Sequence, residues 1–259
     1  MNFRRLLTSK RKKTRLKIVK RKANESIKPL TFSPFTWYHI YIRRTAVKIY
    51  KVKVQFMKEE TLKAVKNAYA IESECITEML DYFDEEKFSQ AVDLLKNAVR
   101  IGTSGCGHSG IICQHLAHLL CCIERPARFI SPAEAVHGAT GFLQEGDVMV
   151  FASRGGKTKE LLPILDICKT KKVKVITVTE NLESPLALGA DVVLKQHVNR
   201  ETDKYNSQGT TSTTALCMIF HALQTALIEE TGFKNEQFAV IHPGGAVGER
   251  LNKEENAKI

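Results

Sequence analysis

Short apolar runs alternate with helical patterns over most of this chain, and this alternation restricts the fold more than any other feature. The runs are rich in β-branched and aliphatic residues, as in "AVRIGTS", "DVMVFAS" and "VKVITVT". Apolar runs of this kind are typical of strands in a parallel sheet that is covered on both faces. We therefore expect an α/β fold whose ligands bind at the carboxyl ends of the strands.

The expected elements follow one another in regular order after residue 57. A polar loop at 199–209 precedes a long helix at 210–231, and a shorter helix leads to "HPGGAVGERL". The strands are predicted at 98–104, 127–131, 147–153, 173–179 and 191–196. The other helical segments are predicted at 58–82, 86–97, 109–123, 132–138 and 159–170, with a single turn at 184–187.

Charge is distributed unevenly, which changes how the net charge of +11 is interpreted. Residues 1–56 hold 17 Lys or Arg residues and one acid, Glu25, whereas the rest of the chain holds 22 basic and 27 acidic side chains. The basic character therefore belongs to an N-terminal tail, and the folded part is mildly acidic. A basic total charge usually suggests a nucleic-acid partner, but this distribution leads us to expect none for the folded part.

The tail, residues 1–56, has two interpretations. It lacks the apolar core of about 7–15 residues that a signal peptide requires, and "FTWYHIYI" is too short to span a bilayer, so no membrane partner is expected. Its Arg-rich, acid-poor composition permits a transit peptide or a nucleic-acid arm. We favour a start at Met57, where an amphipathic helix begins at once; the tail is then a disordered or mis-assigned charged block without an assigned function, and residues 57–259 form one domain.

The seven cysteines indicate a reduced, cytoplasmic protein. None belongs to a C-x-x-C pair or to a Cys/His cluster with zinc-finger spacing, so we expect no metal site. Most lie in apolar helical surroundings, which is typical of free core cysteines. Cys106 differs because a thiol in a turn before a helix can be acidified and reactive, although a small filler is the simpler interpretation.

A glycine-rich turn, "GCGHSG" at 105–110, joins the first predicted strand to a helix. Its G-x-G-x-x-G spacing is that of a dinucleotide site, in which backbone N–H groups at a helix start bind phosphate. Such a site also needs an acid at the end of the second strand, and Ser131 stands there instead. "FASRGGKT" does not fit a Walker A loop, because Phe151 occupies the position of its first glycine. We therefore expect no nucleotide cofactor, and NAD(P) binding would be needed to revive an oxidoreductase interpretation.

Two polar clusters lie where the predicted topology brings them to the same edge of the sheet. "SRGGKTKE" at 153–160 follows a strand, and "TTSTT" at 210–214 opens the long helix. Ser and Thr are also common helix caps. Two such clusters together with a glycine-rich turn nevertheless favour a phosphate pocket, held by hydrogen bonds and helix dipoles.

The order "GCGHSG … SPAEAVHG … SRGGKTKE … TTSTTA … HPGGAVG" resembles the sugar-isomerase (SIS) domain over residues 58–252. Within that superfamily it is most similar to the bacterial arabinose-5-phosphate isomerases, which interconvert arabinose 5-phosphate and ribulose 5-phosphate. "PAEAxHG" and "HPGGAxG" are its most specific pieces, because the general fold does not require them. The resemblance implies a three-layer αβα sandwich with a doubly wound, flavodoxin-like, five-stranded parallel sheet. Long members of the family add a C-terminal pair of cystathionine-β-synthase-type domains, for which this sequence has no room before Ile259.

The resemblance also implies site residues. In the family, a lysine of the glycine turn, two glutamates and the histidine of "HPGGA" have been proposed as the active site; the last three correspond to Glu160, Glu201 and His242. His137 matches the second histidine of the family's "HPAEAAHG". Together with the polar clusters, the resemblance gives the expected substrate- and phosphate-binding residues: Gly107, His108, Ser109, Ser153, Arg154, Lys157, Thr158, Thr211, Ser212 and Thr213.

Several positions depart from the family pattern and leave the particular sugar open. His108 stands at the family lysine, so Arg154 and Lys157 become the candidates to supply the missing positive charge. Ser131 replaces a histidine, and Ala139 replaces an aspartate. The polar loop before the long helix also differs from the apolar loop of the family.

The chemistry implied by the resemblance suits these residue types. Aldose–ketose isomerisation moves a proton between C1 and C2 through a cis-enediol and needs no redox cofactor. Carboxylate and imidazole fit that task because their surroundings can bring the pKa toward the working pH. Either Glu201 or His242 is expected to transfer the proton while the other handles ring opening or oxygen protonation, and Glu160 orients a hydroxyl or a catalytic partner. The expected function is a phosphosugar isomerase of the arabinose 5-phosphate/ribulose 5-phosphate type.

A non-catalytic alternative remains. SIS domains also serve as sugar-phosphate sensors in transcription regulators, and the loss of the family lysine fits a binder, whereas retention of both glutamates and His242 favours catalysis. The resemblance further implies a homodimer or homotetramer in which His242 or His137 acts in a neighbouring subunit's site. The other histidines with no motif around them are expected at surface or core positions: His115, His118, His197 and His221.

Overall fold

The computed structural model describes residues 35–39 and 51–256 of the chain. The chain divides into two units, residues 1–64 and 65–259. The division falls inside a helix, a few residues beyond the predicted domain start at Met57. Each unit is described separately below.

The first unit contains two strands that the interpretation of the tail did not include. β1 (Phe35–His39) and β2 (Lys51–Gln55) pair antiparallel, with Phe35 opposite Gln55. The remainder of the predicted tail lies outside the described residues.

The second unit contains the predicted parallel sheet. Its strands pair in the order β4-β3-β5-β6-β7, and every neighbouring pair is parallel. Counted along the chain, this order is 2-1-3-4-5, the flavodoxin-like arrangement of a doubly wound sheet. The predicted fold class and the five-stranded sheet are confirmed. The strands are β3 (Ile101–Gly105), β4 (Ala127–Phe129), β5 (Val148–Ala152), β6 (Lys174–Thr179) and β7 (Val192–Lys195).

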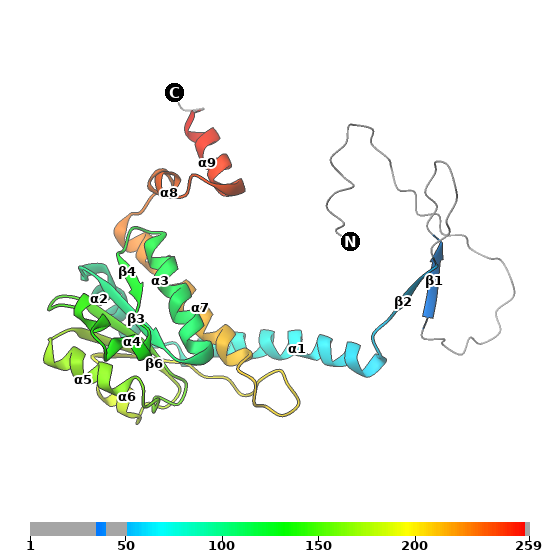
Figure 1. The fold of residues 1–259 in the computed structure, drawn as a ribbon, viewed down its shortest axis with the longest axis horizontal. Helices are drawn as coiled ribbons and strands as arrows, with labels where there is room; N and C mark the ends of the chain where they lie inside the picture. The colour runs from blue at the N-terminus through cyan, green and yellow to red at the C-terminus, as the bar shows by residue number, and fades with distance from the viewer. Residues whose placement is uncertain (1–34, 40–50, 257–259) are drawn as a thin grey trace, which may run out of the picture. The chain divides into compact units, whose positions relative to one another are not determined.

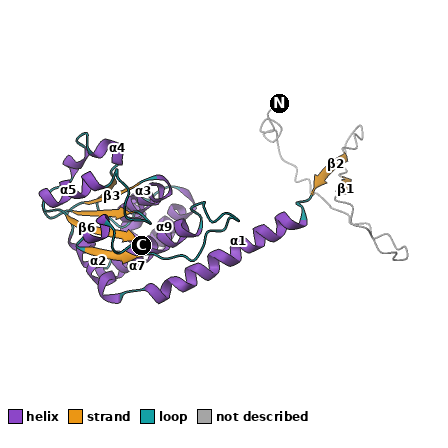
Figure 2. Cartoon of the chain, turned by 90° about the horizontal axis from the view of Figure 1, so that it is seen from below, coloured by secondary structure: helices purple, strands orange, loops and turns teal. Residues whose placement is uncertain are grey.

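Helices cover both faces of this sheet and complete the three layers (Figures 1 and 2). One face carries α2 (Glu85–Asn97), α3 (Gly107–Cys121), α7 (Thr211–Thr231) and the later part of α1 (Glu59–Glu78). The other carries α4 (Pro132–Ala135), α5 (Leu162–Thr170) and α6 (Pro185–Leu188). The remaining elements are η2 (Met79–Tyr82), η3 (Ala139–Phe142), α8 (Asn235–Ile241) and α9 (Gly245–Asn256).

Strand β5 shows why an unbroken apolar run is needed at the centre of the sheet. Val148 and Val150 pack in the core beneath α2, α3 and α7, whereas Met149 and Phe151 pack in the core beneath α5 and α6. All four are at most 2% exposed. Because successive side chains of a strand point to opposite faces, one apolar run supplies both cores.

The glycine spacing of the β3–α3 turn is explained by close packing. A Cβ atom on Gly110 would lie 2.6 Å from the carbonyl oxygen of Gly105, so the strand and the helix cross with no room for a side chain. Gly107 has a φ of +56°, in the left-handed region that favours glycine. Close packing and backbone geometry therefore explain the glycine spacing without a bound nucleotide.

Helix α7 has the length and apolar composition of a membrane span, and it has them because it is a core helix. It is the helix that meets this test among the described residues. Its side chains Leu216, Phe220, Leu223 and Leu227 are buried against the sheet and neighbouring helices. Burial on this scale accounts for its composition without a bilayer.

Candidate active site

Three segments bring the predicted site residues to the carboxyl edge of the sheet: the β3–α3 turn, the β5–α5 turn and the start of α7. The first two begin side by side, because Gly105 pairs with Ala152 at the ends of β3 and β5. The ring of His108 lies next to Gly209, since a Cβ on Gly209 would be 3.2 Å from His108 Cδ2 and 3.5 Å from Thr213 Oγ1. The β3–α3 turn and the start of α7 are therefore neighbours.

The β5–α5 turn is closed by its own hydroxyl groups. Ser153 Oγ lies 2.8 Å from Thr158 Oγ1 and accepts the N–H of Gly156 at 3.1 Å. Gly156 has a φ of +63°, and a Cβ there would lie 1.9 Å from Ser184 Oγ at the start of α6. The turn is thus fixed in place, while Lys157 is exposed and, among the described residues, has no ion-pair or hydrogen-bond partner.

An open pocket of about 380 Å³ lies beside this turn. The β3–α3 turn forms one wall, Phe129, Ser131 and Pro132 form another, and Glu160 contributes a carboxylate. Its volume falls within the usual range for small-ligand sites. Glycine backbone at a helix start and a nearby carboxylate are groups that bind an anion and move a proton.

Cys106 lines the same pocket. Burial and the neighbouring carboxylate of Glu160 both raise the pKa of its thiol above the ordinary value. The thiol is therefore protonated near neutral pH, and the structure favours the small-filler interpretation over a reactive thiolate.

Glu201 is buried, with 3% exposure, and both of its carboxylate oxygens are occupied. Oε2 accepts hydrogen bonds from Thr210 N at 2.8 Å, Thr210 Oγ1 at 3.1 Å and Ser212 N at 3.1 Å, and Oε1 lies 2.7 Å from Arg154. Burial raises the pKa of Glu201, but the hydrogen bonds from Ser212 and Thr210 outweigh it and hold the pKa below its usual value. The carboxylate thus serves as the N-terminal cap of α7.

Arg154 is neutralised by two carboxylates within the chain, and its expected contact with a phosphate stays a prediction. Its guanidinium lies 2.7 Å from Glu180 and 2.7 Å from Glu201. Glu180 in turn lies 2.8 Å from His197 Nδ1, whose ring packs on Tyr82 with centroids 4.4 Å apart. Glu180 and His197 were not predicted as part of the site. The position of Glu180 directly after β6, at the carboxyl end of a parallel strand, was the signal that could have identified it.

Residues of the hydroxyl cluster at the start of α7 form hydrogen bonds with other parts of the same chain. Thr213 Oγ1 donates to the carbonyl of Gly209 at 2.6 Å, and the carbonyl of Ser212 accepts a hydrogen bond from Gln196. Thr211 is fully buried, and its hydroxyl has no partner among the described residues. Since the carboxylate of Glu201 already occupies the helix N-terminus, phosphate binding by these three hydroxyl residues stays a prediction.

His242 lies at the opposite end of the helix layer. Helix α7 has 21 residues and is therefore about 30 Å long; α8 follows its far end, where Gln237 donates to Glu124 beyond the C-terminus of α3 (Figure 1). The His242 ring stacks on Phe238 with centroids 4.9 Å apart, and its buried Nδ1 has no partner among the described residues. A single chain does not bring His242 to Glu160 or Glu201.

His137 also lies away from the pocket lining. It is exposed, follows α4 and precedes Gly138, which has a φ of +106°. Helix α9, whose first turn contains part of "HPGGAVGERL", was not predicted. The glycine-rich motif has low helix propensity and so gave no sign of this helix. Its first residue, Gly245, has a φ of +70°.

The sequence model of the SIS domain matches residues 94–226, about half of the chain. The chain belongs to the SIS domain family. This SIS domain is 37% identical to a Listeria monocytogenes str. 4b F2365 protein with a provisional sugar-phosphate isomerase assignment; the match covers 73% of this chain and 100% of that one, with a TM-score of 0.70.

Two other relatives carry names that describe a ligand or an activity. This SIS domain chain is 34% identical over 188 residues to arabinose 5-phosphate isomerase KdsD of Pseudomonas aeruginosa, a match covering 73% of this chain and 58% of that protein. The chain thus spans somewhat more than half the length of that curated relative. It is also 27% identical to Escherichia coli CFT073 c3406, solved in complex with arabinose 5-phosphate, covering 72% of this chain and 100% of that one with a TM-score of 0.66.

Proposed function

We propose that this chain is an aldose–ketose isomerase that interconverts arabinose 5-phosphate and ribulose 5-phosphate, or a closely similar phosphosugar pair, through an enediol. The observation that carries the proposal is the open pocket in which the glycine turn of α3 faces the carboxylate of Glu160. The relatives named for arabinose 5-phosphate isomerisation, and the relative solved with arabinose 5-phosphate bound, support this substrate class. The reaction needs no redox cofactor.

The polar groups divide the work in this proposal. Lys157 and the N–H groups of Gly107, His108 and Ser109 at the start of α3 bind the phosphate, because they combine an unpaired cation with helix-dipole donors. Glu160 transfers the proton between C1 and C2, since its exposed carboxylate faces the pocket. These assignments refine the expected roles.

Glu201 is a positioning residue in this scheme. Its oxygens are engaged by Arg154 and by the donors of α7, and a lowered pKa makes it a weak base. It fixes the start of α7, whose Thr213 lies near His108 in the β3–α3 turn. The proton-transfer role expected for Glu201 passes to Glu160.

His242 acts in the site of a second copy of the chain. It follows α8, which contacts Glu124 beyond the end of α3 that lies away from the pocket, and its Nδ1 is unpaired within the described residues. A homodimer or homotetramer, in which one copy's α8 end reaches another copy's pocket, supplies the imidazole for ring opening or oxygen protonation.

We also propose that the protein is soluble and located in the cytoplasm. All seven cysteines are free, as is usual in a reducing compartment.

The first test follows proton exchange in D₂O. The full chain is incubated with a panel of sugar phosphates headed by arabinose 5-phosphate, and proton NMR records ketose formation and deuterium at C2. Exchange that is lost in Glu160→Gln but kept in the exposed control Glu145→Gln supports the proposal. Micromolar binding of a sugar phosphate without any exchange would favour the sensor alternative instead.

A second test addresses the shared site. Glu160→Gln and His242→Ala homo-oligomers are both expected to be inactive. Mixing them under subunit exchange should restore about one quarter of wild-type activity, because half of the dimers are mixed and each mixed dimer has one intact site. If mixing restores nothing, His242 does not act across the interface.

A further inference from the structure

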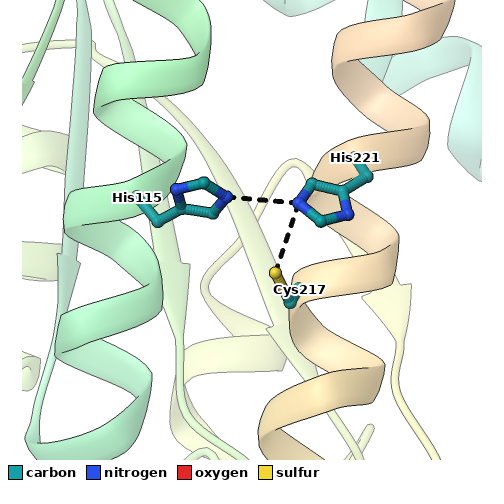
Figure 3. Close-up of side chains that lie close together, drawn as sticks. All are labelled: His115, Cys217 and His221. Carbon is teal, nitrogen blue, oxygen red and sulfur yellow. Dashed lines mark hydrogen bonds between the residues drawn. The ribbon is translucent and has the colours of Figure 1, made fainter. Parts of the chain in front are cut away.

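Midway along α3 and α7, three side chains that sequence spacing did not connect lie together. His115 comes from α3, and Cys217 and His221 come from α7 (Figure 3). The Nε2 atoms of the two histidines are 3.1 Å apart, and Cys217 Sγ lies 3.3 Å from His221 Nε2. One nitrogen or sulfur atom from each residue falls within 4.8 Å of the other two. The cluster shares no residue with the pocket described above.

The geometry of this cluster follows from helix packing. Cys217 and His221 are four residues apart, so they lie on one face of α7. That face packs beside α3, as the hydrogen bond from Gln224 to the carbonyl of Leu119 shows. Tetrahedral zinc, with bonds of about 2.0–2.1 Å to nitrogen and about 2.3 Å to sulfur, needs donor atoms roughly 3.3–3.6 Å apart. The two closest contacts in the cluster are within about 0.3 Å of that range.

The protonation states also suit metal binding. Burial, together with His221 and His118, lowers the pKa of His115, so its imidazole is neutral near pH 7 and has a lone pair to donate. Burial raises the pKa of the Cys217 thiol, so metal binding has to displace its proton. His115 and Cys217 are half-buried and His221 is exposed, so an ion can reach the cluster from solvent.

We propose that His115, Cys217 and His221 form a binding site for a zinc-type divalent ion, with water in the fourth position, that cross-links α3 and α7. Two imidazoles and one thiolate form a ligand set that binds zinc in preference to harder cations such as Mg²⁺ or Ca²⁺. The ion joins two helices that otherwise meet through apolar packing and few hydrogen bonds. The proposal is independent of the proposed isomerase activity.

Zinc titration of the full, tag-free chain after chelator treatment tests the proposal. Calorimetry should give one Zn²⁺ per chain. The double variant Cys217→Ser/His221→Ala should bind at least about 100-fold more weakly, since losing direct ligands costs more than losing their supporting partners. Circular dichroism of each variant checks that it is folded.

A matched control is provided by a second Cys–His pair, at the C-terminal end of α3. Cys122 Sγ lies 3.6 Å from His118 Nε2 at the same four-residue spacing, and no third ligand joins that pair among the described residues. The variant His118→Ala/Cys122→Ser should therefore keep wild-type zinc affinity. Equal loss in this control and in the site variant would mean that zinc binds to scattered surface groups, and the proposal would fail.

Cobalt gives a readout of the ligands themselves. Co²⁺ added to the wild-type chain should produce a thiolate-to-cobalt charge-transfer band and the intense visible bands of a tetrahedral site. The charge-transfer band should disappear in Cys217→Ser and persist in Cys122→Ser. Its absence in the wild type, or a zinc stoichiometry near zero, would overturn the proposal.

Discussion

The start of α7 and the β5–α5 turn lie at the same sheet edge, yet their polar groups are in opposite states. At the start of α7, both oxygens of Glu201 are engaged, one of them by Arg154 at the beginning of the turn, whose guanidinium also pairs with Glu180. In the turn, Lys157 and Glu160 are exposed and lack ion-pair partners in the described part of the chain. Residues that the same family pattern marks as functional therefore divide into those that build the edge and those that remain free to bind.

The largest effect is expected for Glu160→Gln. This change removes the free carboxylate of the pocket, so kcat should fall by about 10²- to 10⁴-fold, the usual contribution of a general base. The melting temperature should stay close to wild type because Glu160 is exposed. NMR exchange and thermal denaturation measure the two quantities. Unchanged kcat would place the chemistry at the α7 side of the comparison.

Glu201→Gln should lower the stability of the fold directly, whereas Glu160→Gln should lower kcat and leave stability unchanged. The change leaves Arg154 and the N-terminal donors of α7 without a buried carboxylate, so the free energy of unfolding should fall by about 2–3 kcal/mol. Urea denaturation measures this, with Glu145→Gln, an exposed pair partner of Lys172, as a near-neutral control. Full stability with lost activity would show instead that Glu201 acts on the substrate.

Lys157→Ala tests the free cation of the turn. Loss of one charge-assisted phosphate contact should raise KM about tenfold and leave kcat nearly unchanged. Lys159→Ala is the matched control, because Lys159 is an exposed cation two residues away. If the two variants behave alike, only the general charge of the turn matters.

The smallest effect is a pH dependence. Hydrogen bonds hold the folded-state pKa of Glu201 below its ordinary value of 4.5. Its contribution to stability is therefore complete above that ordinary value and is lost as the pH falls through the folded pKa. The stability difference between wild type and Glu201→Gln should be constant from about pH 7 to pH 5 and shrink below about pH 4.5. Urea titrations at several pH values measure it; a difference that grows on acidification would contradict the assignment of the lowered pKa.

The sequence was sufficient for the sheet because periodicity and β-branched runs are local signals. Strand β5 and helix α7 are both read from neighbouring residues. The partners of the polar groups are not local: Arg154 meets Glu201 from 47 positions away, and His115 meets His221 from 106. Such pairs depend on how the sheet and helices pack, and this packing cannot be read from the spacing of residues along the chain.

The two ends of the helix layer differ in how far sequence predicts them. The carboxyl edge could be predicted because parallel strands end together. The position of His242 could not, since it depends on the direction that the chain takes after Gly232, where α7 ends with a φ of +66°. Glycine-rich "HPGGAVG" likewise gave no helix signal for α9.

The crossing of β3 and α3 sets what natural variation this turn can tolerate. Gly105 and Gly110 are limited by volume, because a Cβ at either would press on the other segment at 3.0 Å or less. Gly107 is limited only by its backbone angle, since in the described part of the chain no atom lies within 4 Å of where its Cβ would stand. Asparagine and aspartate also adopt that angle. Among descendants of this sequence, the outer two glycines should be invariant and the middle one should drift toward asparagine.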